Sequence, residues 1–398
     1  MEKPLILIFP FDLLSHYLRC LDLVKTLKTS YCIRFAESNA YSDFIIKEGF
    51  QTFKCQSLDS RQVMECAKKF DFSWLNISNL EPVFLDQVKT IKELKPALVL
   101  GDTSPTLKMA AEAAGVKYIS LMNAYMSKHY SGVRKLSRTH PAFKFSQKLP
   151  ENVFDQITRF AESIAFYHVH RPFKKLRKKY RLKKMKAYLD ELEGDLNLLC
   201  DLEELFPSKA LPSNYKAISP LFHDDINTKG EVNFNLDPRK KTIFVSMGST
   251  GSWEKVAFLN DHYFSKFNVI AAADNNRILS ATHIMSLPFI NVNDLFPHID
   301  LVISHGGNGT IYQALVYGIP VLCKTALFEQ EWNVKGLVRT GLGCSLDSVE
   351  TLEDYQLKIE EWIDKKATPP FIAAKTAIAR RREELHKEVH EYFESMLR

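Results

Sequence analysis

Residues 301–320 read LVISHGGNGTIYQALVYGIP and contain the pattern on which the fold depends. An apolar run ends in His305, Gly306 and Gly307, and a second apolar segment, with helical spacing, stops at Gly318. A continuous apolar run followed by a helix is typical of a buried strand in a parallel sheet with both faces covered. This stretch therefore predicts a strand, a turn and a helix of an α/β protein.

Strand-like runs and helical segments alternate on both sides of this stretch. A length of 398 residues exceeds one ordinary hydrophobic core, so two domains are expected. The strand-like runs lie at 5–11, 31–38, 96–102, 116–123, 241–249, 268–273, 288–292, 301–306 and 318–324. Four of these runs lie before residue 124 and five lie after residue 240. These two series predict two Rossmann-like halves with parallel sheets.

The composition suggests where these halves divide. A segment rich in Pro, Asn and Asp, with little periodicity, lies between the two series of strands. A long charged pattern with helical spacing ends the chain. We therefore expect an N-terminal domain over 1–210, a linker over 211–240, a C-terminal domain over 241–372, and a helix over 373–398 that packs back on the N-terminal domain.

The bulk composition excludes several classes of protein. A hydrophobic fraction of 45 % and a charged fraction of 25 % are those of an ordinary globular protein. No apolar run approaches the length of a membrane span, and the first twelve residues are more typical of a buried strand than of a signal peptide. Seven scattered cysteines without a CxxC pair argue against disulfides and structural zinc, and favour a cytoplasmic location. The net charge of +6 is too modest to indicate nucleic acid by itself.

The turn after residue 304 has the features of an anion site. Ligands of parallel sheets bind beyond the carboxyl ends of the strands, where the next helix directs its free N–H groups and positive dipole end. His305 adds a ring N–H and Thr310 a hydroxyl, a set that suits a diphosphate. Three glycines allow close approach of a ligand to the backbone: Gly306, Gly307 and Gly309. The same residues also fit a plain strand-to-helix turn closed by a capping box of Thr310 and Gln313.

Three further motifs follow at regular offsets: Gly318-Ile319-Pro320, Glu329-Gln330 with Asn333, and Gly341-Leu342-Gly343. Together with HGGNGT they resemble the donor-binding signature of the UDP-dependent glycosyltransferases, the family of the plant and bacterial small-molecule enzymes. The resemblance implies the GT-B fold, in which two Rossmann-like domains face each other across a cleft that holds the active site. It also implies transfer of a sugar from a nucleotide sugar with inversion of the anomeric centre.

The resemblance assigns roles to residues of the C-terminal half. His305 and Thr310 would hold the donor's phosphates, and Glu329 and Gln330 its sugar hydroxyls. The segment FVSMGSTG resembles the family's first C-terminal loop, which would place three residues beside the donor: Gly248, Ser249 and Thr250. A simple β-turn is the alternative for these three.

The nucleotide is less closely defined. The family commonly has a glutamate for the ribose hydroxyls where this chain has Gln313, and an amide forms a weaker bond than a carboxylate. The donor implied is a UDP-sugar, with a dTDP-sugar as the alternative, and no other cofactor is expected. No Asp-x-Asp follows a strand, so we also expect no required metal.

The N-terminal half offers a candidate base. Transfer to a hydroxyl requires removal of a proton, and histidine oriented by a carboxylate is the usual device. His16 and Asp102 both follow strands, so they are expected at the same edge of the sheet, and the resemblance supports this dyad. An ordinary loop histidine and an Asp N-cap are the alternatives, and Asp12 is a weaker rival carboxylate. Asn123 and Tyr125 also follow a strand and are candidate acceptor contacts.

Residues 171–189, RPFKKLRKKYRLKKMKAYL, contain ten Lys and Arg. Four apolar residues recur roughly on one face of the expected helix: Phe173, Leu176, Tyr180 and Met185. A solvated amphipathic helix is the first interpretation of this segment, and a contact with an anionic membrane surface is the alternative. A nucleic-acid contact ranks third because no motif accompanies it, and no nucleic-acid partner is expected.

Three functions are compatible with the whole sequence. The first is an O-glycosyltransferase acting on a small or lipidic hydroxyl compound. The second is a nucleotide-sugar epimerase of the same fold, which needs no acceptor. The third is a donor-binding partner protein without catalytic activity. The His16–Asp102 pair argues against the third, and the Glu329–Gln330 pair argues against the second.

Overall fold

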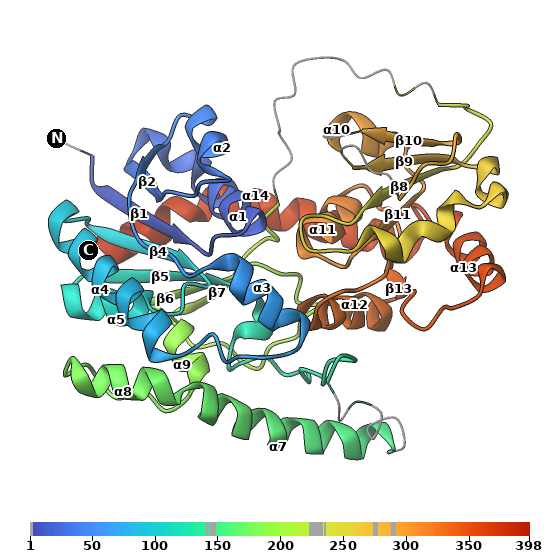
Figure 1. Cartoon of the computed structure of the whole chain (residues 1–398). Helices are drawn as coiled ribbons and strands as arrows, with labels where there is room; N and C mark the ends of the chain where they lie inside the picture. The colour runs from blue at the N-terminus through green and yellow to red at the C-terminus, as the bar shows by residue number, and fades with distance from the viewer. Residues whose placement is uncertain are drawn as a thin grey trace. The chain divides into compact units, whose positions relative to one another are not determined.

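The computed structural model describes residues 3–140, 143, 149–222, 234, 236–273, 278–287 and 292–398. The chain forms two compact units (Figure 1). Unit 1 comprises Met1–Leu221 and Arg382–Arg398, and unit 2 comprises Phe222–Arg381. The division falls within the linker expected over 211–240, which lies partly outside the described residues. The strand expected over 288–292 also lies outside them, except for Val292, where helix α10 begins.

In the described part of unit 1, seven parallel strands form one sheet in the order β3-β2-β1-β4-β5-β6-β7. The strands are short and apolar, and β4 is buried along its whole length, as expected for a parallel sheet covered on both faces. The strands are β1 Leu5–Pro10, β2 Cys32–Ala36, β3 Gln51–Phe53, β4 Leu98–Asp102, β5 Lys117–Met122, β6 Leu196–Leu199 and β7 Tyr215–Ala217. The helices are α1 Leu14–Val24, α2 Ser42–Lys47, α3 Ser60–Lys68, α4 Ile77–Leu94, α5 Leu107–Ala114, α7 Glu151–Val169, α8 Arg171–Lys179 and α9 Tyr188–Leu192.

The described part of unit 2 repeats this design with six parallel strands in the order β10-β9-β8-β11-β12-β13. The strands are β8 Thr242–Ser246, β9 Asn268–Ala272, β10 Ile284–Leu287, β11 Leu301–Ser304, β12 Val321–Cys323 and β13 Gly343–Ser345. The helices are α10 Val292–Leu295, α11 Asn308–Val316, α12 Phe328–Thr340, α13 Leu352–Ile363 and α14 Pro369–Leu397. The expectation of two Rossmann-like halves with parallel sheets is confirmed.

Helix α14 ends in the core of unit 1. Leu385, Val389, Phe393 and Met396 recur at helical spacing and are buried in the same cluster as β1 and α1. The ring of Phe393 lies 6.1 Å from that of Tyr31, measured between centroids. Arg382–Arg398 therefore belongs to unit 1, although the helix begins in unit 2.

Both sheets reverse their strand order at one point, and chemistry-bearing side chains follow the strands at that point. In unit 1 the reversal lies between β1 and β4, where Pro10 pairs with Asp102. In unit 2 it lies between β8 and β11, where Ser246 pairs with Ser304. Open α/β sheets bind ligands in the crevice outside the carboxyl ends of such strands. The fold therefore gives each unit one natural binding position.

The basic segment 171–189 differs from expectation because it is not one helix. Helix α8 ends at Lys179, and α9 begins only at Tyr188. Phe173 and Leu176 are buried against the unit rather than displayed on an outer face. Arg177 is buried as well, and its guanidinium bonds to Glu191 and Glu112. The other nine Lys and Arg of this segment are exposed.

Across the stretches that the structure describes, no helix is both long and apolar enough to cross a bilayer.

Candidate active site

His16 and Asp102 meet at the reversal point of unit 1. Leu13 is the N-cap of α1, so His16 lies in the first turn of this helix rather than in the preceding loop. Its Nδ1 lies 3.0 Å from Oδ1 of Asp102, the last residue of β4, whose side chain is 0 % exposed. The alternative role for Asp102 is excluded, because the N-cap of the next helix, α5, is Thr106.

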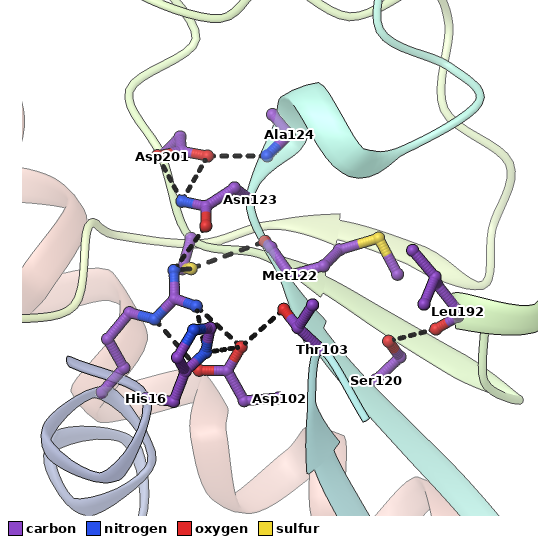
Figure 2. Close-up of polar contacts among 11 residues, drawn as sticks. His16, Asp102, Thr103, Ser120, Met122, Asn123, Ala124, Leu192 and Asp201 are labelled. Atoms are coloured by element: carbon purple, nitrogen blue, oxygen red, sulfur yellow. Dashed lines mark hydrogen bonds and ion pairs between the residues drawn. The ribbon is translucent and has the colours of Figure 1, made fainter. Parts of the chain in front are cut away.

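A third residue that the sequence reasoning missed, Arg19, completes this group. Its Nε donates to Asp102 Oδ2 at 3.0 Å and its Nη2 to Oδ1 at 2.7 Å, which is the paired geometry that guanidinium and carboxylate groups favour. Arg19 stands three residues after His16 on α1, so both side chains lie on one face of the helix, and both contact Asp102 of β4. Figure 2 shows His16 beside Asp102. The place of Arg19 as the one Lys or Arg within α1, three residues after His16, was the signal that could have identified it.

These contacts decide the charge state of Asp102. Burial alone works to raise the pKa of the Asp102 carboxyl, but the Arg19 guanidinium and then His16 more than offset burial, so the pKa lies below its ordinary value. The ion pair with Asp102 likewise keeps the pKa of Arg19 well above its ordinary value despite burial. Asp102 and Arg19 are therefore a permanently ionised pair at neutral pH.

The Oδ1 atom of Asp102 fixes the orientation of the imidazole. Besides Arg19 and His16, the Thr103 hydroxyl donates to it at 3.1 Å. Nδ1 of His16 faces two groups at 3.0 Å: Asp102 Oδ1, which only accepts, and Arg19 Nη2, which only donates. The contact with Asp102 requires the tautomer in which Nδ1 carries the proton. In that tautomer Nε2 keeps its lone pair and is able to accept a proton.

The chain is strained directly after Asp102. Thr103 has a φ of 53°, in the left-handed region that β-branched residues seldom adopt. This turn directs its hydroxyl back to the Asp102 carboxylate. Strain of this kind persists where surrounding contacts enforce it, often at functional sites.

Asn123 and Tyr125, the candidate acceptor contacts, are both buried. Asn123 Oδ1 accepts from Arg19 Nη1 at 2.6 Å, and its Nδ2 donates to Asp201 at 3.1 Å (Figure 2). The Tyr125 ring lies 5.2 Å from that of Phe206, measured between centroids. Asn123 thus anchors the far side of Arg19, and a contact of either residue with an acceptor stays a prediction.

In unit 2, His305 follows β11 and its ring is enclosed by glycines. The residue is only 8 % exposed. A Cβ atom on Gly307 would lie 2.4 Å from His305 Nε2, and one on Gly248 would lie 2.6 Å from its Cε1. Both distances are shorter than any real contact, so these glycines provide the space for the imidazole. Gly248 and Gly306 also have φ values of 53° and 88°, which favour glycine.

Burial lowers the pKa of His305, and the backbone of Ser246 and the charge of Glu329 offset this only in part. The imidazole is therefore neutral at physiological pH. It would contribute one hydrogen bond, and not a positive charge, to a bound phosphate.

The N-terminus of α11 is open to a ligand. Gly307 is its N-cap, and no side chain caps the helix. Thr310 lies inside the first turn, so the capping box of Thr310 and Gln313 is excluded. A Cβ atom on Gly309 would meet nothing within 4 Å, which means that free space lies beside this turn. Unshared N–H groups at a helix start attract anions.

Helix α12 supports the same turn. Asn333 is buried and donates to the carbonyl of Gly306 at 2.9 Å. Gln330 is also buried; its Oε1 accepts from the N–H groups of Ala326 and Leu327, and its Nε2 donates to Thr250 at 3.0 Å. Gln330 therefore links the start of α12 to the loop after β8, which includes Ser249.

The polar side chains assigned to the sugar and ribose differ in exposure. Glu329 is exposed beside Gln330, and Gln313 is half-buried on α11. Contacts of Glu329, Gln330 and Gln313 with a donor stay predictions. Within the described ranges, no three His, Cys, Asp or Glu side chains form a group that could hold a metal ion.

Comparisons with known proteins agree with this architecture. Residues 231–389 match the glycosyltransferase family 28 C-terminal domain. A PGL/p-HBAD biosynthesis glycosyltransferase of Mycobacterium tuberculosis is 26 % identical over 345 residues, which cover 84 % of this chain and 78 % of the relative.

Solved structures show the same fold. The glycotransferase of kitacinnamycin superposes with a TM-score of 0.72 at 13 % identity, covering 100 % of both chains. The Streptomyces glycosyltransferase SsfS6, complexed with thymidine diphosphate, has a TM-score of 0.68 at 13 % identity and covers 98 % of this chain and 100 % of its own. With two Rossmann-like units and a C-terminal part similar to the family 28 C-terminal domain, the chain is a glycosyltransferase of the GT-B fold.

Proposed function

We propose that this enzyme transfers a sugar from a nucleoside diphosphate sugar to a hydroxyl group, with inversion and without a metal, and that His16 is the general base. The observation that carries the proposal is the contact of His16 Nδ1 with Asp102 Oδ1 at 3.0 Å, at the reversal point of unit 1. That contact leaves Nε2 free to act on a substrate. General bases of this kind are most effective near neutral pH.

The proposed reaction is a single displacement. His16 Nε2 removes the proton of the acceptor hydroxyl as its oxygen attacks the anomeric carbon. The bond from that carbon to the diphosphate oxygen breaks, and the nucleoside diphosphate leaves with the bonding electrons. Asp102 stabilises the imidazolium formed, and Arg19, held by Asn123, keeps the carboxylate in place.

Unit 2 is proposed to bind the donor. The diphosphate would lie at the open N-terminus of α11, near His305, Gly309 and Thr310, where N–H groups and the helix dipole favour the charge that develops on the leaving group. Ser249 and Thr250 would border it. A UDP-sugar is the donor implied by the motif; the thymidine diphosphate bound to SsfS6 supports a dTDP-sugar as the alternative.

A nucleotide-sugar epimerase and a catalytically silent partner protein are the competing functions. Incubation with a nucleotide sugar alone separates them, because an epimerase alters the sugar without releasing nucleoside diphosphate. A silent partner would bind the nucleotide and leave the sugar unchanged with every acceptor.

The acceptor is proposed to be a small or lipidic alcohol. The mycobacterial relative is named for PGL/p-HBAD biosynthesis, and screening of hydroxyl compounds with UDP- and dTDP-sugars would identify the acceptor of this enzyme. A lipidic acceptor would place the enzyme at a membrane surface, to which the nine exposed cations of 171–189 offer charge.

His16→Ala is expected to lower kcat by about 10²–10⁴, the usual contribution of general-base catalysis, while the KM for the donor stays nearly unchanged. Asp102→Asn should also lower kcat, because it removes the charge that stabilises the imidazolium. Steady-state kinetics with thermal unfolding as a control would test this. Turnover near that of the wild type in His16→Ala would refute the assignment.

Arg19→Lys is expected to reduce kcat by at least about ten-fold, because a lysine keeps the charge but cannot form the paired bonds to Asp102. If Arg19 acts through the dyad, the same change should have little further effect on kcat in the His16→Ala background. Equal losses in both backgrounds would instead mean that Arg19 affects turnover independently of His16.

His305→Ala should weaken binding of nucleoside diphosphate by about 1.5–3 kcal/mol, the contribution of a hydrogen bond to a charged group. Gly309→Ala is the sharper variant, because its methyl group enters free space in the unliganded protein yet would obstruct a diphosphate. Isothermal titration should therefore show weaker binding while the unfolding temperature does not fall. Unchanged affinity in Gly309→Ala would place the diphosphate elsewhere.

Gln313→Glu tests the ribose contact. If residue 313 faces the ribose, a carboxylate should tighten the binding of UDP and do little for dTDP, which lacks the 2′-hydroxyl. Calorimetric titration of both nucleotides against both proteins measures the difference. An identical change for UDP and dTDP would exclude the contact.

A further inference from the structure

Helix α7 carries an apolar face that the fold leaves uncovered. Six large apolar side chains, between 40 % and 70 % exposed, lie along α7 or just before it: Leu149, Val153, Ile157, Phe160, Ile164 and Tyr167. They are six of the eleven large apolar side chains that are exposed among the described residues. Their spacing of three and four residues places them in one stripe on one side of the helix. From Val153 to Tyr167 this apolar stripe is about 21 Å long, at about 1.5 Å per residue.

The opposite side of α7 attaches the helix to unit 1. Glu162 pairs with Arg134, whose guanidinium lies 5.7 Å from the centre of the Phe166 ring. Phe166 in turn lies 6.1 Å from Tyr188, measured between ring centroids. Asp155 also pairs on this side, with Lys135 at 3.7 Å. The carboxylates of Asp155 and Glu162 are thus engaged on the packed side and do not border the apolar stripe.

A concentrated positive charge continues from the end of the apolar stripe. Helix α8 follows α7 directly, and Figure 1 shows the two helices running one after the other along the margin of unit 1. The Arg171 guanidinium lies 5.7 Å from the centre of the Tyr167 ring, so the last residue of the stripe touches the first cation. Eight more exposed cations follow: Lys174, Lys175, Lys178, Lys179, Arg181, Lys183, Lys184 and Lys186.

We infer that α7 lies in the interface of an anionic lipid membrane, with the apolar stripe inserted among the acyl chains and the cations of 171–186 on the headgroups. An exposed apolar face next to a cluster of Lys and Arg is the combination that interfacial helices use, since apolar burial and attraction to acidic lipid add together. The cations alone would supply only a screened attraction, and their own apolar neighbours, Phe173 and Leu176, are buried. The apolar stripe of α7 supplies side chains that can insert among the acyl chains. This inference does not depend on the proposed chemistry, because membrane binding requires no donor.

The test is sedimentation of the full chain with vesicles of phosphatidylcholine alone, or of equal parts phosphatidylcholine and phosphatidylglycerol. Binding should require the anionic lipid and weaken as sodium chloride is added. Phe160→Asp should weaken binding by at least about ten-fold, because an ionised side chain resists entry into the bilayer. Ile46→Asp is the control, since Ile46 is an exposed apolar residue (55 %, against 70 % for Phe160) on α2 of the same unit, and this variant should bind as the wild type does.

A second pair of variants tests the charge. Replacement of Lys174, Lys175, Lys178 and Lys184 by glutamine should weaken binding and flatten its dependence on salt, whereas Lys68→Gln, on α3, should change neither. Absence of binding to anionic vesicles, or equal binding of Phe160→Asp and the wild type, would overturn the inference. It would also be overturned if Phe160→Asp left vesicle binding intact and converted an oligomer to a monomer, because the apolar stripe would then be a contact between copies of the chain.

Discussion

The buried ion pair of Arg19 and Asp102 is the constraint around which the site of unit 1 is built. Two opposite charges removed from water are tolerated only when geometry and further hydrogen bonds compensate for lost hydration. Here all three nitrogens of the Arg19 guanidinium have partners. Nε and Nη2 donate to the two oxygens of Asp102, and Nη1 donates to Asn123 Oδ1. The histidine is added to a pair that is already satisfied. The Arg19–Asp102 pair therefore orients the imidazole of His16 before any substrate binds.

The fold was predictable because its signals are local. Apolar runs followed by glycine or a polar residue mark strands of a parallel sheet, and the order of the two series of strands gives two Rossmann-like halves. The meeting of His16 and Asp102 was predictable for the same reason, since the carboxyl ends of neighbouring strands share one edge. The exact placement of His16 within α1 was not, because the helix starts at a leucine without a capping side chain.

What the sequence did not reveal depends on contacts between distant segments. Arg19 looks like one cation on an amphipathic helix until β4 brings Asp102 to it across 83 positions of the chain. Asn123 was expected only as an acceptor contact, and its amide also bonds to Arg19 and Asp201, which the sequence did not indicate. The basic segment was expected to be one helix, but α8 ends at Lys179, and Arg177 is buried where it bonds to Glu191 and Glu112. The apolar stripe of α7 becomes visible only once exposure is known.

The two units place a histidine at corresponding positions of their sheets but in different surroundings. In unit 1 a histidine is held at Nδ1 by the charged side chains of Asp102 and Arg19. In unit 2 a histidine bonds to the backbone of Ser246, and glycines leave the space that its ring occupies. The first arrangement suits proton transfer, which requires a defined tautomer. The second suits recognition of an anion, which requires close approach of the backbone.

Thr103 affects both the stability of the fold and the position of the Asp102 carboxylate. A glycine would adopt its left-handed backbone at lower energy, so stability alone would favour replacing the threonine. Only the threonine, however, supplies the hydroxyl that binds Asp102 Oδ1. Selection for a more heat-resistant protein and selection for a firmly held carboxylate therefore act in opposite directions at this residue. Efforts to raise the thermal tolerance of the enzyme should leave position 103 untouched and seek their gains on surfaces remote from β4.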